Sequence, residues 1–298
     1  MHNTSTLALD CRCTLGEGIV WSPNLQSVLW TDIEKSTLWM YRPHDGIARQ
    51  WSLPDRLGCF AMCRSGRLLL GLAKSLAFAE VDFDGGSPLR VAPVMPIEPG
   101  GTRTRINDGR TDRAGNFVFG TYNEAQDAAS GSFYQYSSRF GLRRLDLGGV
   151  VIPNSICFSL DGRTMYFCDS PTGLIRRCDY DADSAGVANI RDFVQYRDGD
   201  GFPDGSIVDG EGHLWNAVWG AGVVRRFNAE GALVEQTAVP SRNLTCPVFG
   251  GTALDQLFVT SSRQEMTEDE LNRAPTCGGL FLIRPNVTGI PDALFSDR

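Results

Sequence analysis

The sequence lacks long apolar segments and runs of basic residues, and each absence excludes a class of protein. No apolar run approaches the roughly 18 residues of a membrane-spanning helix, and the opening residues MHNTSTLALDCRC lack the basic and apolar regions of a signal peptide. The net charge of -7 comes from scattered charges, without a basic stretch that could follow a phosphate backbone. We therefore expect a cytoplasmic protein that binds neither membranes nor nucleic acid, while its oligomeric state stays open.

Paired cysteine motifs and a serine nucleophile motif are also missing. The nine cysteines include no C-x-x-C pair, and an odd number does not suit a disulfide framework, so neither a zinc knuckle nor a disulfide scaffold is indicated. Several cysteines lie inside apolar runs such as SICFSL and MYFCDS, where a thiol behaves as a small buried hydrophobe. No G-x-S-x-G motif is present, so a serine hydrolase is not predicted.

An internal repeat organises the rest of the chain. Each unit has a polar turn ending in glycine, followed by a short apolar strand, and the turn glycines are Gly66, Gly115, Gly162 and Gly212. Their spacings of 49, 47 and 50 residues match the four-stranded blade of a β-propeller. Two further segments, around Leu25 and Leu254, have the same layout and bring the number of units to six. The sequence therefore predicts an all-β, six-bladed β-propeller that forms a single domain over residues 1–298.

The phase of this repeat places four polar side chains at one end of the predicted channel. Counting back eight residues from the turn of a unit gives Glu17, Asn107, Asn154 and Asp204. Because the innermost strands of a propeller line its central channel, these side chains should converge there. Two carboxylates and two amides suit Ca²⁺, Mg²⁺ or Mn²⁺, and Zn²⁺ also accepts oxygen ligands. The alternative is that these residues only cap strands or tie neighbouring blades together.

Two further aspartates share a phase with this set. Asp32 and Asp169 each lie 15 residues after a member of it, Glu17 and Asn154 respectively. We expect both aspartates to serve as structural acceptors at a strand end or turn.

Four motifs in this phase resemble the SMP-30/gluconolactonase/regucalcin family. They are LGEG-x-VW at 15–21, R-x-NDG at 105–109, PNS at 153–155 and PDG-x-x-VD-x-EG-x-LW at 203–215. They occur in order at compatible spacing, and the resemblance runs from about residue 14 to about residue 285. It implies a six-bladed propeller with one divalent metal ion in its central channel (Ca, Zn, Mg, Mn or Fe) and hydrolysis of sugar lactones.

The resemblance also implies individual roles. By motif, Glu17, Asn154 and Asp204 resemble the protein ligands of the metal ion. Arg105 and Asn107 resemble substrate-binding residues beside the metal, and Glu124, in GTYNEA, lies near the place of a further substrate contact.

Hydrolysis of a lactone requires polarisation of its carbonyl group and delivery of a water molecule, and these side chains could serve both functions. Asp204 would be both a ligand and the general base, or it would be the hydrogen-bond partner of a water activated by the metal. Arg105 has several donors that can stabilise developing oxyanion charge on the lactone carbonyl, and Asn107 would orient hydroxyl groups.

The sequence therefore predicts a metal-dependent sugar lactonase. Its substrate would be a pentono- or hexonolactone, such as L-arabinono-1,4-lactone, converted to the aldonic acid. The segments PNSICFSLDGRTMYF and FPDGSIVDGEGHLWNAVWG look more like bacterial pentonolactonases than animal members of the family. Three alternatives stay open at this point: a gluconolactonase, an organophosphate-type hydrolase on the same fold, and a non-catalytic cation-binding propeller.

Overall fold

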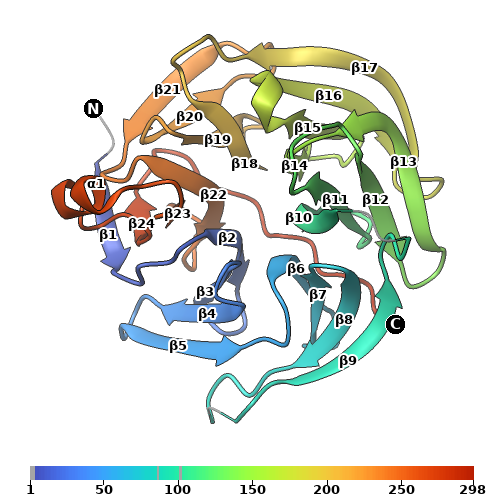
Figure 1. The fold of residues 1–298 in the computed structure, drawn as a ribbon, viewed down its shortest axis with the longest axis horizontal. Coiled ribbons are helices and arrows are strands. Elements are labelled where there is room, and N and C mark those ends of the chain that lie inside the picture. The colour runs from blue at the N-terminus through green and yellow to red at the C-terminus, as the bar shows by residue number, and fades with distance from the viewer. Residues whose placement is uncertain (1–3, 86, 101–102) are drawn as a thin grey trace.

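Six antiparallel sheets of four strands each stand around a central channel in the computed structural model, which describes residues 4–85, 87–100 and 103–298 (Figure 1). In five of the sheets the four strands follow one another along the chain. The sixth combines three strands near the C-terminus with the first strand of the chain. The prediction of an all-β, six-bladed propeller is confirmed.

The strands fall into four concentric sets, from the channel outward. The inner strands are β2 (Gly16–Ser22), β6 (Leu57–Met62), β10 (Thr104–Thr111), β14 (Pro153–Phe158), β18 (Phe202–Val208) and β22 (Asn243–Gly250). The second strands are β3 (Ser27–Asp32), β7 (Leu68–Leu72), β11 (Phe117–Asn123), β15 (Thr164–Asp169), β19 (Leu214–Trp219) and β23 (Gln256–Ser262). The third strands are β4 (Thr37–Arg42), β8 (Ser75–Glu80), β12 (Gly131–Ser137), β16 (Leu174–Asp181), β20 (Val223–Phe227) and β24 (Leu280–Ile283). The outer strands are β5 (Ile47–Ser52), β9 (Arg90–Pro96), β13 (Gly141–Val150), β17 (Gly186–Gln195), β21 (Leu233–Ala238) and β1 (Ser5–Leu9). We number the blades 1 to 6 in the order of their inner strands.

The ring is closed by pairing between the two ends of the chain. Strand β1 is antiparallel to β24, with Ser5 opposite Ile283 and Leu7 opposite Phe281. Blade 6 therefore takes its outer strand from the N-terminus, and this pairing ties the two ends of the chain together.

The glycine-containing turns that repeat along the sequence join an inner strand to the second strand of its blade. The four turn glycines have φ between 72° and 93°, a region that favours glycine over residues with a Cβ atom. In two of the turns an aspartate carboxylate organises the loop: Asp112 Oδ1 accepts from the backbone N–H groups of Ala114 and Asn116, and Asp209 Oδ1 does the same for Glu211 and His213. The repeat seen in the sequence is therefore the repeat of these turns.

Helices are short in the described part of the chain. They are a 3₁₀ turn, η1 (Ser170–Thr172), and one α-helix, α1 (Glu268–Arg273), which Thr267 and Glu270 begin with a reciprocal capping box. Among the described residues no helix has the length and apolar character needed to cross a lipid bilayer.

The C-terminal segment, residues 285–298, runs across the end of the channel where the repeat turns lie (Figure 1). Its backbone bonds to turns of several blades: Gly289 N–H donates to Leu254, Gly210 N–H to Thr288, and Ser296 N–H to Gly115. Phe295 is fully buried, and its N–H donates to the carbonyl of Met62 in blade 2. This segment acts as a strap that closes one end of the channel.

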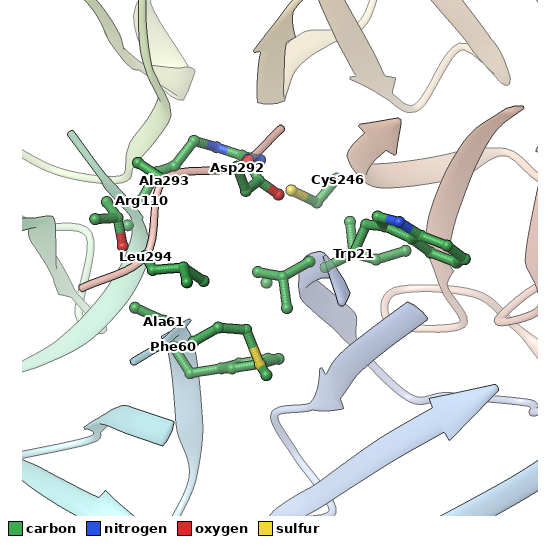
Figure 2. Close-up of a pocket in the computed structure, with 14 residues that line it drawn as sticks. Trp21, Phe60, Ala61, Arg110, Cys246, Asp292, Ala293 and Leu294 are labelled. Atoms are coloured by element: carbon green, nitrogen blue, oxygen red, sulfur yellow. The ribbon is translucent and has the colours of Figure 1, made fainter. Parts of the chain in front are cut away.

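A gap of only about 20 Å³ is left under the strap, enough for a single water. Figure 2 shows Asp292, Ala293 and Leu294 of the strap on one side of this gap, across from Trp21 and Cys246. Arg110 of β10 donates to Asp292 Oδ1 at 2.7 Å. In the part of the chain that the structure describes, the strap narrows this end of the channel to that gap, and the larger cavity lies at the other end.

Candidate functional site

The open end of the channel is a cavity of about 350 Å³, a size that fits a small organic molecule. Five of the six blades line it, and blade 2 contributes none of the described lining residues. The residues at its base and on its walls include Glu17, Arg105, Asn107, Asn154, Ser170, Phe202, Asp204, Trp219, Gln264 and Glu265. Five of the six site residues predicted from the sequence meet in this one cavity.

Each inner strand carries a β-bulge near the base of this cavity. In β2, Glu17 pairs with Thr31 and Val20 with Leu29, so three steps on the inner strand span two on its partner. The other five inner strands also carry one extra residue at this level. Bulges next to active sites re-aim side chains, and here they turn residues of β2, β10, β14 and β18 into the channel. No side chain comes from blade 2, because a Cβ atom on Gly58 would lie 2.4 Å from the carbonyl oxygen of Ile106.

The loops that lead into two of the inner strands are fixed by equivalent aspartates. The Asp32 carboxylate accepts from Thr14 N–H at 2.9 Å and Leu15 N–H at 3.1 Å, two residues before Glu17. The Asp169 carboxylate accepts from Val151 N–H and Ile152 N–H in the same way, just before Asn154. The expectation that these two aspartates are structural acceptors is confirmed, and each one holds the start of a strand that carries a site residue.

A directional chain of hydrogen bonds joins blades 3, 4 and 5 across the floor of the cavity. Arg105 Nη1 donates to Asn107 Oδ1 at 2.7 Å, and Asn107 Nδ2 donates to Asn154 Oδ1 at 3.2 Å. Asn154 Nδ2 donates to Ser170 Oγ at 2.9 Å, and Ser170 donates to the carbonyl of Pro203, next to Asp204. This chain fixes the orientation of both amides, so that the oxygen of Asn107 faces Arg105 and the oxygen of Asn154 lies beside Asn107.

Three carboxyl groups meet at this level with little to neutralise them. Burial and the nearby Asp108 carboxylate raise the pKa of Glu17 to about 8. Burial, followed by the charges of Glu17 and Asp108, raises the pKa of Asp204 well above its usual value. Burial likewise raises the pKa of Asp108 to about 6, although its Oδ2 accepts from Ile156 N–H at 2.8 Å. The site therefore carries excess negative charge whenever these groups are ionised.

Two buried polar atoms of the cavity have no hydrogen-bond partner among the described residues. They are Asp204 Oδ1, an acceptor, and Arg105 Nε, a donor. Because leaving a buried polar atom unpaired is costly, such atoms call for an explanation in a ligand, an ion or a water. The pair indicates a site that receives both a positive centre and an oxygen atom of a ligand.

The donor set at the base of the cavity fits a divalent cation. Glu17 and Asp204 offer carboxylate oxygens and Asn154 an amide oxygen, which hard cations prefer, and a positive charge would offset the repulsion between the carboxylates. No three His, Cys, Asp or Glu side chains gather in a metal-binding arrangement in the described ranges, so the amide oxygen of Asn154 is needed as the third ligand. The amide oxygens of both asparagines also accept one hydrogen bond each, that of Asn107 from Arg105 and that of Asn154 from Asn107.

Glu124 lies at the rim and does not line the cavity. Both oxygens of its carboxylate accept from the Arg56 guanidinium, at 2.6 and 3.2 Å, and its Oε1 is 3.6 Å from Arg105 Nε. The Arg56 guanidinium lowers the pKa of this carboxyl. The carboxylate of Glu124 therefore forms ion pairs with two arginines, Arg56 and Arg105.

Sequence reasoning missed several residues of the cavity. Asp108 does not line the cavity, but its buried carboxylate acts on Glu17 and Asp204 from behind it; it belongs to the R-x-NDG motif, so its position next to Asn107 was the available signal. Phe202 and Trp219 are paired across β18 and β19 and form an aromatic wall, and Phe202 is 49% exposed. Gln264 and Glu265 follow β23 and lie outside every repeat motif, so no sequence signal marked them.

The chain is similar in sequence to proteins of one known family. The sequence pattern described as the SMP-30/Gluconolactonase/LRE-like region matches residues 15–263. An L-arabinolactonase from Azospirillum brasilense is 41% identical over 98% of this chain and 95% of its own length. A 6-deoxy-6-sulfogluconolactonase from Pseudomonas putida is 31% identical over 99% of this chain and all of its own length.

Among solved structures, a calcium-binding protein, regucalcin, from Agrobacterium tumefaciens superposes with a TM-score of 0.90. It is 28% identical, and the superposition covers 99% of this chain and 97% of that one. The likeness extends over the whole ring, including the blades that line the cavity.

Proposed function

Because this chain belongs to the SMP-30/gluconolactonase/LRE-like family, we propose that it hydrolyses sugar lactones in the cavity around Glu17, Arg105 and Asp204. Lactonases among its relatives are hydrolases of cyclic esters, and this chain is an enzyme of the same class. The observation that carries the assignment of the site is the pair of unpartnered buried atoms, Asp204 Oδ1 and Arg105 Nε, in one open cavity.

Glu17, Asn154 and Asp204 would hold one divalent metal ion. When bound, such an ion supplies Lewis-acid polarisation of a carbonyl oxygen. The oxygen-only donor set favours Ca²⁺, Mg²⁺ or Mn²⁺, with Zn²⁺ and Fe²⁺ as further candidates. A related solved structure is described as calcium-binding, which supports a divalent ion in this fold.

Arg105 would bind the lactone through Nε, a donor that has no hydrogen-bond partner among the described residues. Its Nη1 is committed to Asn107 and to the carbonyl of Ile106, and its guanidinium lies 4.7 Å from the centre of the Tyr122 ring. These contacts fix the side chain, and Nε, whose contact with Glu124 Oε1 is 3.6 Å long and not a hydrogen bond, would donate to a substrate oxygen. A fixed donor that costs no reorganisation is suited to stabilising the negative charge that develops on the carbonyl oxygen.

Asp204 would move the proton during ring opening. Its unpartnered Oδ1 can accept a proton from the water that attacks the carbonyl carbon. As the bond from the carbonyl carbon to the ring oxygen breaks, the same carboxyl can return that proton to the ring oxygen, and the product is the hydroxy acid.

The walls of the cavity offer aromatic side chains for the C–H groups of a sugar and polar side chains for its hydroxyl groups. Phe202 and Trp219 present an aromatic surface that can pack against C–H groups of a ring. Asn107 and Gln126 on blade 3 and Gln264 on blade 6 can bond hydroxyl groups. Glu124 would act on the substrate side by holding Arg105 from the rim.

The substrate would be a pentono- or hexonolactone, such as L-arabinono-1,4-lactone. A cavity of about 350 Å³ accommodates a lactone of five or six carbons, and the L-arabinolactonase relative supports the pentonolactone. We further propose that the chain works in the cytoplasm as a single domain. All nine cysteines are free thiols and eight of them are buried, which suits a reducing compartment.

Proton release from a panel of aldonolactones tests the function. Metal-stripped protein is compared with protein to which single divalent ions are restored, in the presence of a pH indicator. We expect hydrolysis well above the spontaneous rate, dependent on one or more of these ions. Absence of metal-dependent acceleration for every lactone would overturn the proposal, and acceleration for phosphotriesters alone would redirect it to the organophosphate chemistry.

A further inference from the structure

The wall of the cavity formed by blade 6 differs from the wall that faces it. Blade 6 stands across the ring from blade 3 (Figure 1), so Gln264 and Glu265 lie opposite the side that bears Arg105. A lactone whose carbonyl oxygen meets Arg105 therefore directs its remaining carbon chain toward the other walls, and blade 6 provides the one farthest from Arg105.

The backbone that carries Glu265 is firmly held. Gln264 N–H donates to the carbonyl of Thr14 at 3.1 Å and to Ser262 Oγ at 2.9 Å, and Asn243 Nδ2 donates to the Gln264 carbonyl at 2.9 Å. These bonds tie the turn to blade 1 and to the inner strand of blade 6. The position of Glu265 at the cavity is therefore set by the fold and not by a loose loop.

Glu265 itself has a backbone conformation that does not favour its side chain. Its φ is 60°, in the left-handed region where glycine or asparagine costs least and other residues are strained. A glutamate at this position does not stabilise the turn. Glu265 lines the cavity at this place.

Few charged side chains of the cavity could neutralise an anion bound near Glu265. Glu265 forms no ion pair with any residue in the described ranges. Arg105 is the only cation among the described lining residues, and it is already engaged with Asn107 and Glu124. A ligand that carries a second negative group at the end remote from its lactone carbonyl would meet Glu265 without a cation to neutralise it.

We propose that Glu265 makes the enzyme selective for uncharged lactones by repelling those that carry an anionic group at the far end of the sugar chain. The inference rests on the proposed function and identifies Glu265 as a specificity-determining residue of that site. In solution, unit charges several ångströms apart in a partly hydrated cleft change affinity by roughly 3- to 10-fold, and salt weakens the effect.

A matched substrate pair tests this inference. A hexono-1,4-lactone and the corresponding hexaro-1,4-lactone differ only in that a carboxylate replaces the terminal CH₂OH group. We expect the ratio of kcat/KM to favour the uncharged lactone, and Glu265→Gln to reduce this ratio by about 3- to 10-fold, mainly through KM. Raising the ionic strength should also reduce the ratio for the wild-type enzyme, because salt screens the repulsion.

The control is Glu268→Gln, which removes the same charge three residues away on α1, outside the cavity. It should leave the ratio unchanged. A second variant, Glu265→Gly, should lose the selectivity and keep or raise Tm, because glycine relaxes the left-handed backbone. A lower Tm with unchanged selectivity would mean that Glu265 is structural, and an equal effect of Glu268→Gln would mean that only the overall charge matters; either result overturns the inference.

Calorimetric binding of the corresponding hexonolactam and its carboxylated counterpart separates this inference from the proposed function. Lactams resist hydrolysis, so a preference for the uncharged lactam that Glu265→Gln reduces would support the role of Glu265 even if no lactone were hydrolysed. Equal binding of the two lactams by the wild-type protein would overturn the inference even if lactones were hydrolysed.

Discussion

The two ends of the channel are built from the same six inner strands and serve opposite purposes. At the open end, three buried carboxyl groups lie close together and Asp204 Oδ1 and Arg105 Nε have no partner. At the strapped end, Arg110 is paired with Asp292, and Phe295 is buried between blades 2 and 3. At the open end, carboxyl groups face one another and two polar atoms lack partners in the described part of the chain; at the strapped end, Asp292 Oδ2 also lacks a hydrogen bond, but its carboxylate is paired with Arg110 through Oδ1 and apolar packing surrounds it.

This difference separates the residues that we propose to bind and react from those that hold the ring together. Sites that must receive a ligand keep groups unsatisfied, and this costs stability that other parts of the molecule supply. Substitutions at the open end should therefore remove activity with little loss of stability. Substitutions at the strapped end should do the reverse.

The largest effect is expected for Asp204→Asn. It should lower kcat/KM at least about 1,000-fold, because the carboxylate that moves the proton is lost, and calorimetry should detect weaker binding of divalent ions. The free energy of unfolding of the metal-free protein should stay unchanged or rise, since one of the two facing carboxyl groups is gone. Asp198→Asn, an exposed aspartate outside the cavity, is the control. A strongly destabilised Asp204→Asn protein would contradict the division between the two ends.

Phe295→Ala should produce the largest loss of stability at the strapped end. The ring is fully buried, stacks on Tyr136 at 5.6 Å and contacts Phe78. Truncation of such a residue costs about 3–5 kcal/mol, measurable by urea unfolding. Leu294→Ala, at the exposed neighbouring position, should cost far less. The folded Phe295→Ala enzyme should keep its kcat/KM within about 3-fold, and a much larger drop would show that the strap shapes the active end.

Arg105→Lys should lower kcat/KM about 100-fold, as expected when one preorganised donor to an oxyanion is removed. Lysine keeps the charge but loses the Nη1 bonds to Asn107 and Ile106 and the Nε donor. Binding of divalent ions by calorimetry should change less than about 3-fold, because Arg105 is not a proposed ligand. Arg139→Lys on the surface provides the comparison. Loss of ion binding in parallel with activity would place Arg105 in the metal site.

Asp292→Asn should have the smallest effect, a loss of about 2 kcal/mol in the free energy of unfolding. It leaves the Arg110 guanidinium without its anion, but both side chains are partly exposed, at 12% and 19%, so the cost stays below that of breaking a fully buried pair. Urea unfolding measures it, with kcat/KM expected near the wild-type value. A larger change in activity than in stability would connect the strap to the site through Arg110.

Much of the site could be predicted because its residues belong to the repeat. Glu17, Asn154 and Asp204 lie at a fixed distance before each turn, and the turn is a local feature that glycine and aspartate mark in the sequence. Even the structural roles of Asp32 and Asp169 followed from the same phase. Asp108 was within reach of this reasoning, since it lies in a recognised motif.

Other features had no local signal. Strand β1 has no turn motif of its own, so its place as the outer strand of blade 6 depends on where the ring closes. The aromatic wall, Glu265 and the rim position of Glu124 depend on which loops meet over the cavity. The strap crosses several blades through backbone bonds to their turns, and backbone bonds leave no side-chain pattern to recognise.

By itself, then, the sequence determined the number of blades and the side chains that converge on the open end of the channel, because each is repeated at a period that short-range turn chemistry imposes. Only the tertiary structure decided which end of the channel is open, how the ring is closed and what lines the cavity beyond the inner strands. Those features arise from contacts between segments far apart in the chain, such as Arg110 with Asp292, whose energies depend on the completed ring.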